Sequence, residues 1–240
     1  MMRRLLFFLL LLLPAACGHK GPVRPLGVPL PAAVEQLSVT QYGNTLVVSW
    51  QAPPANQDGS ALHDLNGFAV YRQTYNPMDD CPECRPPREP AAVIPAEPGQ
   101  HSYRFVDRQA LQPGTGYRYR VVALNGSGQE GAPATGAQIF ESPPGAPANL
   151  EGQALEKINR LTWQPPEQGD PEGYRLERAE GAATDNFILL ADLPGGQPRY
   201  DDFAVTPGTS YHYRVRAIYT RGDRTLFSEA TAVTTLTARP

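Results

Sequence analysis

The 240-residue sequence has no excess of positive charge and no basic stripe. It carries 21 Lys and Arg against 24 Asp and Glu, a formal net charge of −3. Removing Arg3 and Arg4 with the leader described below gives 19 against 24, or −5. Binding to nucleic acid needs cationic side chains that neutralise phosphates. The composition therefore argues against nucleic acid as a partner.

Recognised catalytic motifs are also lacking. The sequence contains no H-E-x-x-H, no G-x-S-x-G, no phosphate-cradling glycine loop and no calcium-loop spacing. The acidic pairs Asp79-Asp80 and Asp201-Asp202 have no His or Ser beside them in a recognised arrangement, so we interpret them as solvated turns. We predict no catalytic residue, no cofactor and a protein that is not an enzyme.

No hydrophobic run is long enough to span a membrane as a helix. Arg3 and Arg4 precede nine apolar residues, Leu5 to Leu13, whereas a span needs about 20. A positive start followed by a short apolar run is typical of an export signal, here residues 1–16. The leader ends in Leu13-Pro-Ala-Ala-Cys17-Gly18, which resembles the lipobox of bacterial lipoproteins, with Pro14 where that family usually has Leu.

The lipobox resemblance implies that Cys17 is lipidated and attaches the chain to a membrane. Gly18 after the cysteine, in place of Asp, implies the outer membrane of a Gram-negative envelope, facing the periplasm. The alternative is an ordinary secreted protein with a free thiol. Residues 17–22, Cys-Gly-His-Lys-Gly-Pro, also resemble the start of a small lipoprotein family associated with lipopolysaccharide export, which supports the lipoprotein interpretation.

Only three cysteines are present, and with Cys17 lipidated the remaining two form the C-x-x-C pair Cys81 and Cys84. In an exported protein we predict a local disulfide between them. A metal site completed by His63 and His101 is an alternative. Redox exchange is another, although no βαβ context places the pair at a helix N-terminus.

The sequence does contain two stretches in which core-type residues occur at every second position. Leu111–Leu124 and Val205–Ile218 each begin with a Pro-Gly turn and continue with Tyr, Tyr, Val and Ala at every second position. A period of two is typical of a half-buried strand. Because turn, strand and phase recur 94 positions apart (211 minus 117), we infer a domain-sized unit that occurs twice.

The rest of each repeat predicts about seven short strands, and 22 Gly and 26 Pro indicate many turns and few helices. We expect strands at 35–40, 45–51, 67–72, 102–106 and 135–140 in unit one, and at 150–153, 158–163, 173–178, 199–203 and 230–236 in unit two, besides the repeated stretches.

These marks resemble the fibronectin type III family. They are the early Trp (Trp50, Trp163), the aromatic that opens the third strand (Phe68, Tyr174), the Leu-x-Pro-Gly-Thr-x-Tyr turn, which has Val205 instead of Leu in unit two, and the Tyr-x-Val-x-Ala strand. The resemblance implies an all-β protein of two tandem immunoglobulin-like Greek-key sandwiches, residues 34–141 and 148–236. It implies that Tyr117 and Tyr211 are tyrosine corners.

Proline-rich segments flank the two units. Residues 17–33 contain four prolines and no periodic apolar face, so we expect a partly extended tether. The linker 142–147, Ser-Pro-Pro-Gly-Ala-Pro, is short and stiff, and a tandem rod with limited bending is the predicted shape. Unit one is longer by about 7 residues after its second strand and about 12 after its third (18 against 11, and 49 against 37), and recognition usually lies in such loops.

From these features we predict a non-catalytic spacer and docking module whose partner is another envelope protein. Glycan or peptidoglycan binding is the alternative, with Tyr75 and Tyr219 as exposed stacking residues. A further alternative is adhesion through Arg221-Gly222-Asp223, which lies between the sixth and seventh strands of unit two. A polar hairpin explains the same three letters, because its Gly supplies a positive φ.

Overall fold

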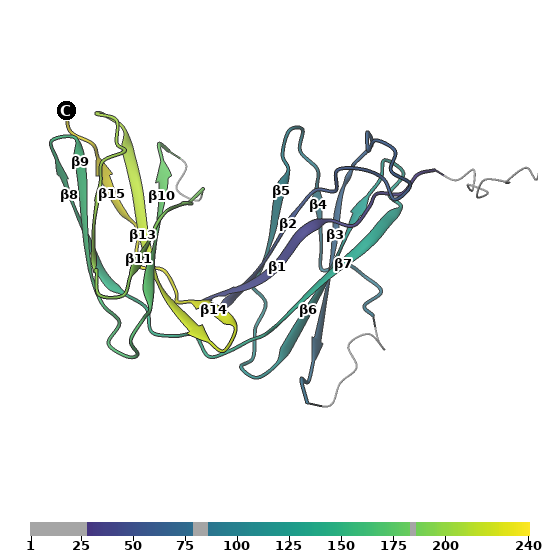
Figure 1. Ribbon diagram of the computed structural model, residues 1–240, viewed down its shortest axis with the longest axis horizontal. Helices are drawn as coiled ribbons and strands as arrows, with labels where there is room; N and C mark the ends of the chain where they lie inside the picture. Colours follow the sequence, from purple (N-terminus) through teal and green to yellow (C-terminus); the bar gives the residue numbers. More distant parts are fainter. Residues whose placement is uncertain (1–27, 79–85, 183–185) are drawn as a thin grey trace, which may run out of the picture.

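The computed structural model describes residues 28–78, 86–182 and 186–240 (Figure 1). Within these ranges every regular element is a β-strand, so the all-β prediction is confirmed. The described residues form no helix that is long and apolar enough to cross a membrane.

Unit one is a sandwich of two antiparallel layers. One layer has the order β1-β2-β5 and the other β4-β3-β6-β7. Their bounds are β1 Glu35–Tyr42, β2 Thr45–Gln51, β3 Gly67–Tyr75, β4 Ala92–Pro95, β5 Ser102–Asp107, β6 Gly116–Leu124 and β7 Glu130–Ile139.

Unit two repeats this plan with one difference in its last strand. One layer has the order β12-β9-β8, and β11, β10 and β13 form the other, in which β14 and β15 both pair with β13. Their bounds are β8 Ala148–Leu155, β9 Ile158–Gln164, β10 Gly173–Glu180, β11 Ile188–Pro194, β12 Arg199–Asp202, β13 Ser210–Arg221, β14 Arg224–Phe227 and β15 Thr234–Thr237.

Each sandwich has its own core, and the alternating residues fill it. In unit one Trp50 meets Phe68 edge-on with ring centroids 5.5 Å apart, and in unit two Trp163 meets Tyr174 in the same way at 5.3 Å. Apolar side chains at every second position face the partner layer, because successive strand residues point to opposite faces. Two separate hydrophobic clusters result.

Three strands differ from the sequence prediction. The prediction missed β4 and β11, which are edge strands with exposed apolar residues; Val93 of β4, for example, is 60% exposed. Such strands show no clean alternation between polar and apolar residues. The third missed strand, β14, precedes the closing strand predicted at 230–236, and that closing strand corresponds to β15. Besides pairing with β13, β14 pairs with β1 of unit one.

The predicted tandem rod is wrong. The β14 strand lies parallel to β1, so that one sheet runs β11-β10-β13-β14-β1-β2-β5 through both units, with β15 as its eighth strand beside β13. Figure 1 shows the two sandwiches side by side, meeting at one end and diverging toward the other. The shape is a V, because backbone pairing fixes an angle that a stiff linker alone does not determine.

The predicted tether ends earlier than residue 33. The Ala32 N–H donates to Ala55 O at 3.1 Å, and the Ala132 N–H donates to Pro31 O at 3.0 Å. Pro31 is buried by these contacts. The last residues before β1 therefore belong to unit one, at the end of the sandwich away from the junction (Figure 1).

Candidate docking site at the junction of the two units

Unit one buries an aspartate between an arginine and a tyrosine. Asp107, at the end of β5, is fully buried and accepts hydrogen bonds from Tyr119 Oη at 2.6 Å and Arg72 Nε at 2.5 Å. Burial, together with the hydrogen bond to Asp107, raises the pKa of Tyr119. Burial opposes the charge on Arg72, but its bond to Asp107 raises the Arg72 pKa overall. The carboxylate, guanidinium and phenol thus compensate one another inside the sandwich.

The same kind of triad recurs in unit two. The interpretation of Asp201-Asp202 as a solvated turn is therefore wrong. Asp202 is 1% exposed and accepts bonds from Tyr213 Oη at 2.9 Å and Arg178 Nη1 at 2.8 Å. Asp201 does lie at the surface, but it forms an ion pair with Arg160 at 2.9 Å. The Asp201-Asp202 pair is therefore structural, because Asp202 at the end of β12 binds the core residue Tyr213.

The two predicted tyrosine corners lie beside these triads. Tyr117 Oη accepts a hydrogen bond from the Gln112 N–H at 2.8 Å, and Tyr211 Oη accepts one from the Thr206 N–H at 3.0 Å. Both rings are buried in the core. They and the triads face away from solvent, so we assign them to stability and look for function elsewhere.

The backbone contact between the units is short and specific. Gln41 of β1 pairs with Leu226 of β14, and Tyr42 pairs with Phe227. The Gly43 N–H extends the pairing by donating to Phe227 O at 2.8 Å. Polar backbone groups of a sheet edge are thereby satisfied across the junction.

Close approach at the junction requires a glycine. Gly43 has a φ of 54°, and a Cβ placed there would lie 2.3 Å from the side chain of Glu229. That side chain accepts a hydrogen bond from the Asn44 N–H at 2.7 Å. A positive φ and a close approach are the two conditions under which glycine is needed.

Aromatic rings and guanidinium groups cover the paired backbone. The rings of Tyr42 and Phe227 stack with centroids 4.6 Å apart and planes 9° apart. Arg175 lies 4.3 Å above the Phe227 ring, and Arg216 lies 5.3 Å from the Tyr42 ring. Stacking and cation–π contacts of this kind add to the burial of the rings.

Glu141, which directly precedes the linker, joins the same interface. Its carboxylate binds Arg221 at 2.8 Å and Arg224 at 2.5 Å. The buried Gln41 side chain receives a bond from the Glu141 N–H at 3.0 Å and donates to its carbonyl at 2.7 Å. Backbone, ring and charge contacts therefore all connect the end of unit one with the β13–β14 hairpin.

Arg221-Gly222-Asp223 closes that hairpin. All three residues are exposed, and Gly222 has a φ of 64°. The Arg221 side chain is 50% exposed and is held by Glu141. Adhesion through this tripeptide stays a prediction, but the hairpin that carries it also contributes β14 to the junction.

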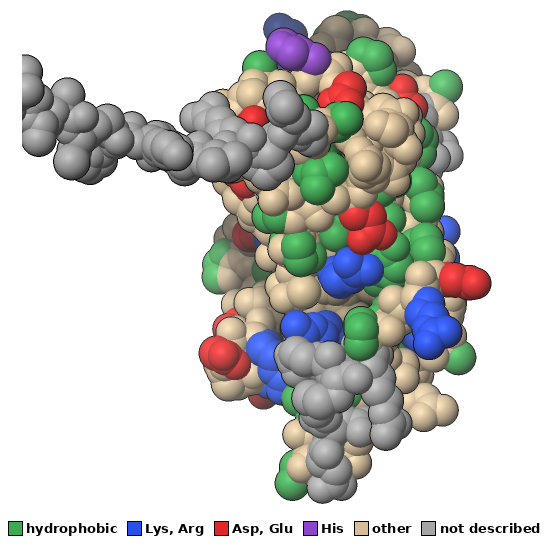
Figure 2. All heavy atoms as spheres, turned by 90° about the vertical axis from the view of Figure 1, so that its right-hand side faces the viewer, with side chains coloured by type: hydrophobic (Ala, Val, Ile, Leu, Met, Phe, Trp, Pro, Cys, Tyr) green, Lys and Arg blue, Asp and Glu red, His purple; other side chains and the backbone are tan. Residues whose placement is uncertain are grey.

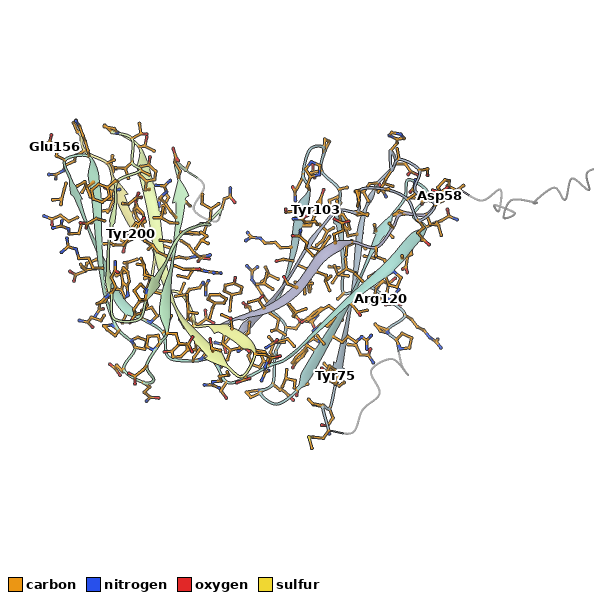
Figure 3. All side chains as sticks on the ribbon, in the orientation of Figure 1. Asp58, Tyr75, Tyr103, Arg120, Glu156 and Tyr200 are labelled. Carbon is orange, nitrogen blue, oxygen red and sulfur yellow. The ribbon has the colours of Figure 1, made fainter. Side chains whose placement is uncertain are left out.

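Between the diverging units lies an open groove of about 520 Å³ (Figure 3). Outward-facing residues of β1, β2 and β5 make up much of its lining, and Ile94 of β4 and Asn186 of unit two also contribute. Polar side chains dominate the lining, which comprises Gln36, Ser38, Ser49, Trp50, Gln51, Ile94, Gln100, Ser102, Tyr103, Arg104 and Asn186. Concave sites where two domains meet are frequent binding sites.

The unit-two side of the V carries a shared ion pair. Glu177 of β10 binds Arg214 at 2.5 Å and Arg216 at 3.3 Å, both from β13. Burial lowers the pKa of Arg216, although the charge of Glu177 acts in the opposite direction. Arg214 lies 4.0 Å above the ring of Phe187. These groups compensate one another and keep the wall rigid.

A second, smaller cavity of about 200 Å³ lies on the opposite face of unit one, over β3, β6 and β7. Figure 2 shows basic and apolar side chains beside each other on this face. Arg120 stacks 3.8 Å above the Tyr71 ring, Tyr71 Oη donates to Glu130, and Glu130 pairs with Arg120 at 3.2 Å. Because these groups already engage one another, the cavity is the weaker candidate.

The other predicted site residues do not meet in the described structure. Cys17, Cys81 and Cys84 lie outside the described residues. His63 and His101 are both exposed, in the segments before β3 and β5. Across the described ranges no group of three or more possible metal ligands comes together. The disulfide, metal and redox alternatives remain predictions.

The prediction that Tyr75 and Tyr219 are exposed is wrong. Tyr75 is half-buried, and a Cβ on Gly116, its partner across the strands, would lie 2.3 Å from its ring. Tyr219 is also half-buried and donates to Gly145 O at 3.0 Å. One ring covers a glycine in the sheet and the other hydrogen-bonds to the linker, so both side chains are already in contact with the protein.

Sequence reasoning missed the junction because its residues look ordinary. Tyr42, Gly43 and Asn44 read as a hairpin turn, and Phe227 lies in a stretch without alternation. One signal was available for the triads: an aspartate precedes each corner tyrosine, by 10 positions at Tyr117 (117 minus 107) and by 9 at Tyr211 (211 minus 202).

Comparison with known proteins places this geometry in context. The model of the fibronectin type III domain matches residues 32–137 and 145–234. Mouse usherin is 35% identical over 115 residues, which is 47% of this chain and 2% of usherin. Human fibronectin type-III domain-containing protein 3A is 30% identical over 124 residues, or 49% of this chain and 10% of that protein. The chain thus spans only a small part of these curated relatives.

Solved structures of tandem domains are similar at low identity. The FN1–FN3 segment of chicken CNTN1 has a TM-score of 0.38 at 16% identity, covering 89% of this chain and 69% of that chain. A two-domain segment of chicken tenascin has a TM-score of 0.33 at 16% identity, covering 85% of this chain and 98% of that one.

Proposed function

Because its two matched segments cover most of its length, the chain belongs to the fibronectin type III family, and we propose that it is a non-catalytic spacer and protein-docking module, lipid-anchored in the periplasm. Domains of this family serve widely as scaffolds, and a fold by itself does not define a reaction. The docking role must therefore be argued from surfaces that this chain presents.

The observation that carries the proposal is the fixed junction. Its backbone pairing, stacked Tyr42 and Phe227 rings and Glu141 ion pairs hold two sandwiches at one angle. A flexible pair of domains must lose orientational freedom when a partner binds both, whereas a preformed V has already lost it. The groove between the units then presents one constant surface.

The anchor rests on sequence. Cleavage before Cys17 and acylation of its thiol would attach residues 17–29 to the outer membrane and let unit one stand off the bilayer on a proline-rich tether. We expect palmitate labelling of the unaltered protein and none of Cys17→Ser. Recovery of unaltered, unacylated protein from the soluble periplasm would refute the anchor.

The docking role is tested by photocrosslinking in intact cells. A benzophenone side chain is placed in the groove at Ser49, on the hairpin at Asp223, or on unit two's remote tip at Glu156. We expect a discrete protein adduct from the groove position and none from Glu156. Absence of protein adducts from every position would overturn the docking function.

Glycan binding is the second candidate, and the polar lining of the groove favours it. Amide and hydroxyl side chains such as Gln36, Ser38 and Gln51 can bind sugar hydroxyls. A peptidoglycan pull-down in which Gln51→Ala abolishes retention would support it. Host-cell adhesion requires instead that Asp223→Glu abolish cell attachment.

A further inference from the structure

We propose that the free edge of β5 binds an extended, acidic peptide segment of a partner protein as an added strand. This inference rests on the proposed docking function and specifies its site and its chemistry. Added strands gain affinity from main-chain hydrogen bonds and specificity from alternate side chains.

The β5 strand ends the eight-stranded sheet, and no described strand pairs with its outer edge. At the start of that edge Ser102 O accepts a hydrogen bond from Gln100 Nε2 at 2.9 Å, so the open stretch begins at Arg104. It is antiparallel to β2, with Trp50 opposite Tyr103 and Ser49 opposite Arg104. The Ala52 N–H donates to His101 O at 2.8 Å. Because bonded pairs alternate along an antiparallel ladder, Arg104 and Val106 direct their N–H and C=O groups away from β2, toward the free edge.

Nothing in the strand itself blocks pairing. Its six residues, Ser-Tyr-Arg-Phe-Val-Asp, contain no proline, and its pairing with β2 has no bulge. Natural sheets usually protect an exposed edge with short strands, proline, bulges or charges. Of these features the β5 edge has only a charge, that of Arg104. Such an edge can serve as a template for another strand.

Unit two provides an internal control, because its equivalent strand is protected. Strand β12 has four residues, follows Pro198, and aligns with β5 at the buried triad, with Asp202 equivalent to Asp107. Asp201 of β12 binds Arg160 at 2.9 Å and Arg199 at 3.0 Å. This edge carries a network of three charges.

In unit one, the three positions equivalent to Asp201, Arg160 and Arg199 contain no carboxylate. Val106 replaces Asp201, Val47 replaces Arg160, and only Arg104 keeps its charge, at the position of Arg199. Within the described ranges Arg104 has no ion pair or hydrogen bond, and its side chain lines the groove. An unpaired guanidinium beside two half-buried valines favours a strand that brings one carboxylate and adjacent apolar residues.

The groove suits a peptide better than a folded domain or a sugar. Its volume of about 520 Å³ is of the order that a short peptide fills. The aromatic residues in its lining, Trp50 and Tyr103, are nearly buried in the core and offer no stacking face. Trp50 Nε1 has no hydrogen-bond partner among the described residues, but neither has Trp163 Nε1 in unit two, so this feature belongs to the fold.

The test uses the purified full chain in detergent and a phage library of random dodecapeptides, followed by synthetic copies of the enriched peptides. Val106→Pro removes an edge N–H that β2 does not use, so the sandwich should still fold. Asp201→Pro makes the equivalent change in β12. We expect enriched peptides to carry Asp or Glu and to lack internal proline, and Val106→Pro to weaken their binding roughly tenfold while Asp201→Pro leaves it unchanged.

Charge reversal refines the assignment. Arg104→Glu should weaken binding of the acidic peptides at least tenfold and favour copies in which Lys replaces the acid. Unchanged binding to Val106→Pro, no enriched peptide, or binding of glycans alone would each overturn the proposal for β5. If peptide binding to β5 fails but protein adducts still form in cells, the docking function stands and only the β5 site is wrong. If peptides bind β5 in vitro but no adduct forms in cells, the β5 site stands and the docking function is wrong.

Discussion

Unit one and unit two share a core and differ at their edges. Both bury a tryptophan against an aromatic residue, both have the tyrosine corner, and both enclose an Arg–Asp–Tyr triad. Unit two extends a long hairpin that pairs with unit one and protects its own edge with charges. Unit one accepts that hairpin on β1 and leaves β5 open. The repeated features thus serve folding, and the unrepeated ones are where we expect function.

The buried triads should give the largest effects. Asp107→Ala leaves Arg72 and Tyr119 without their partner, and we expect a loss of about 3–5 kcal/mol in the free energy of unfolding. Asp202→Ala should cost unit two a similar amount, and the surface variant Asp201→Ala much less. Urea denaturation of the three variants measures this. Equal costs for Asp107→Ala and Asp201→Ala would contradict the claim that a buried triad aspartate contributes more than a surface one, and unequal costs for Asp107→Ala and Asp202→Ala would break the equivalence of the two triads.

The stacked junction should come next. Phe227→Ala removes a ring that is 4% exposed and stacks on Tyr42, and we expect about 3 kcal/mol of destabilisation, confined to unit two and the contact. Small-angle scattering should show a wider spread of shapes. Phe203→Ala, which removes a ring that is 69% exposed in unit two, is the matched control and should change neither quantity. An unaltered scattering profile for Phe227→Ala would show that the ring does not hold the V.

Gly43 distinguishes contact from backbone strain. Gly43→Ala meets both a positive φ and the Glu229 side chain, whereas Gly222→Ala meets a positive φ and, its chain neighbours aside, no atom of a described residue within 4 Å. We expect Gly43→Ala to cost about 1–2 kcal/mol and Gly222→Ala about 1. Thermal unfolding compares them. If the two melt at the same temperature, the close approach at the junction contributes nothing.

The charged edge of unit two should give the smallest effect, and it depends on pH. The hydrogen bond from Arg160, and then that from Arg199, lowers the pKa of Asp201 to about 2. Because the folded pKa lies below the unfolded value of about 3.9, this stabilisation is present above about pH 4 and is lost as the pH falls toward 2.

The neutral variant isolates that contribution. Asp201→Asn should be less stable than the unaltered protein at pH 6, and most of that difference should be lost at pH 2, as measured by chemical denaturation at each pH. Val106 holds the equivalent position in unit one. A difference between the two proteins that is as large at pH 2 as at pH 6 would contradict this origin.

Much of the fold followed from alternation, and the junction did not. Tyr, Tyr, Val and Ala at every second position identify β6 and β13, because a core-facing strand repeats every two residues. The pairing of β14 with β1 depends on two residue pairs between distant segments. No local pattern encodes such a contact. The rod prediction failed for this reason, since linker composition reports stiffness and says nothing of long-range pairing.

The candidate groove could be predicted only in part. The sequence indicates loops and sheet edges as docking surfaces, but it does not tell which edge is covered. Arg104 becomes informative only when β5 and β12 are aligned by their buried aspartates, which reveals valine in place of Asp201. Tyr75 and Tyr219 show the opposite kind of error. Both lie outside the alternation of the core residues and were therefore predicted to be exposed, but Tyr75 packs over Gly116 and Tyr219 binds Gly145 of the linker.

The account depends most directly on the V being one rigid shape. Asp58 and Glu156 mark the two diverging ends (Figure 3), and nitroxides coupled there through a ketone-bearing side chain leave the native cysteines untouched. Pulsed dipolar spectroscopy of the doubly labelled protein should give one narrow distance distribution, which Phe227→Ala broadens. A broad distribution in the otherwise unaltered protein, unchanged by Phe227→Ala, would contradict the account.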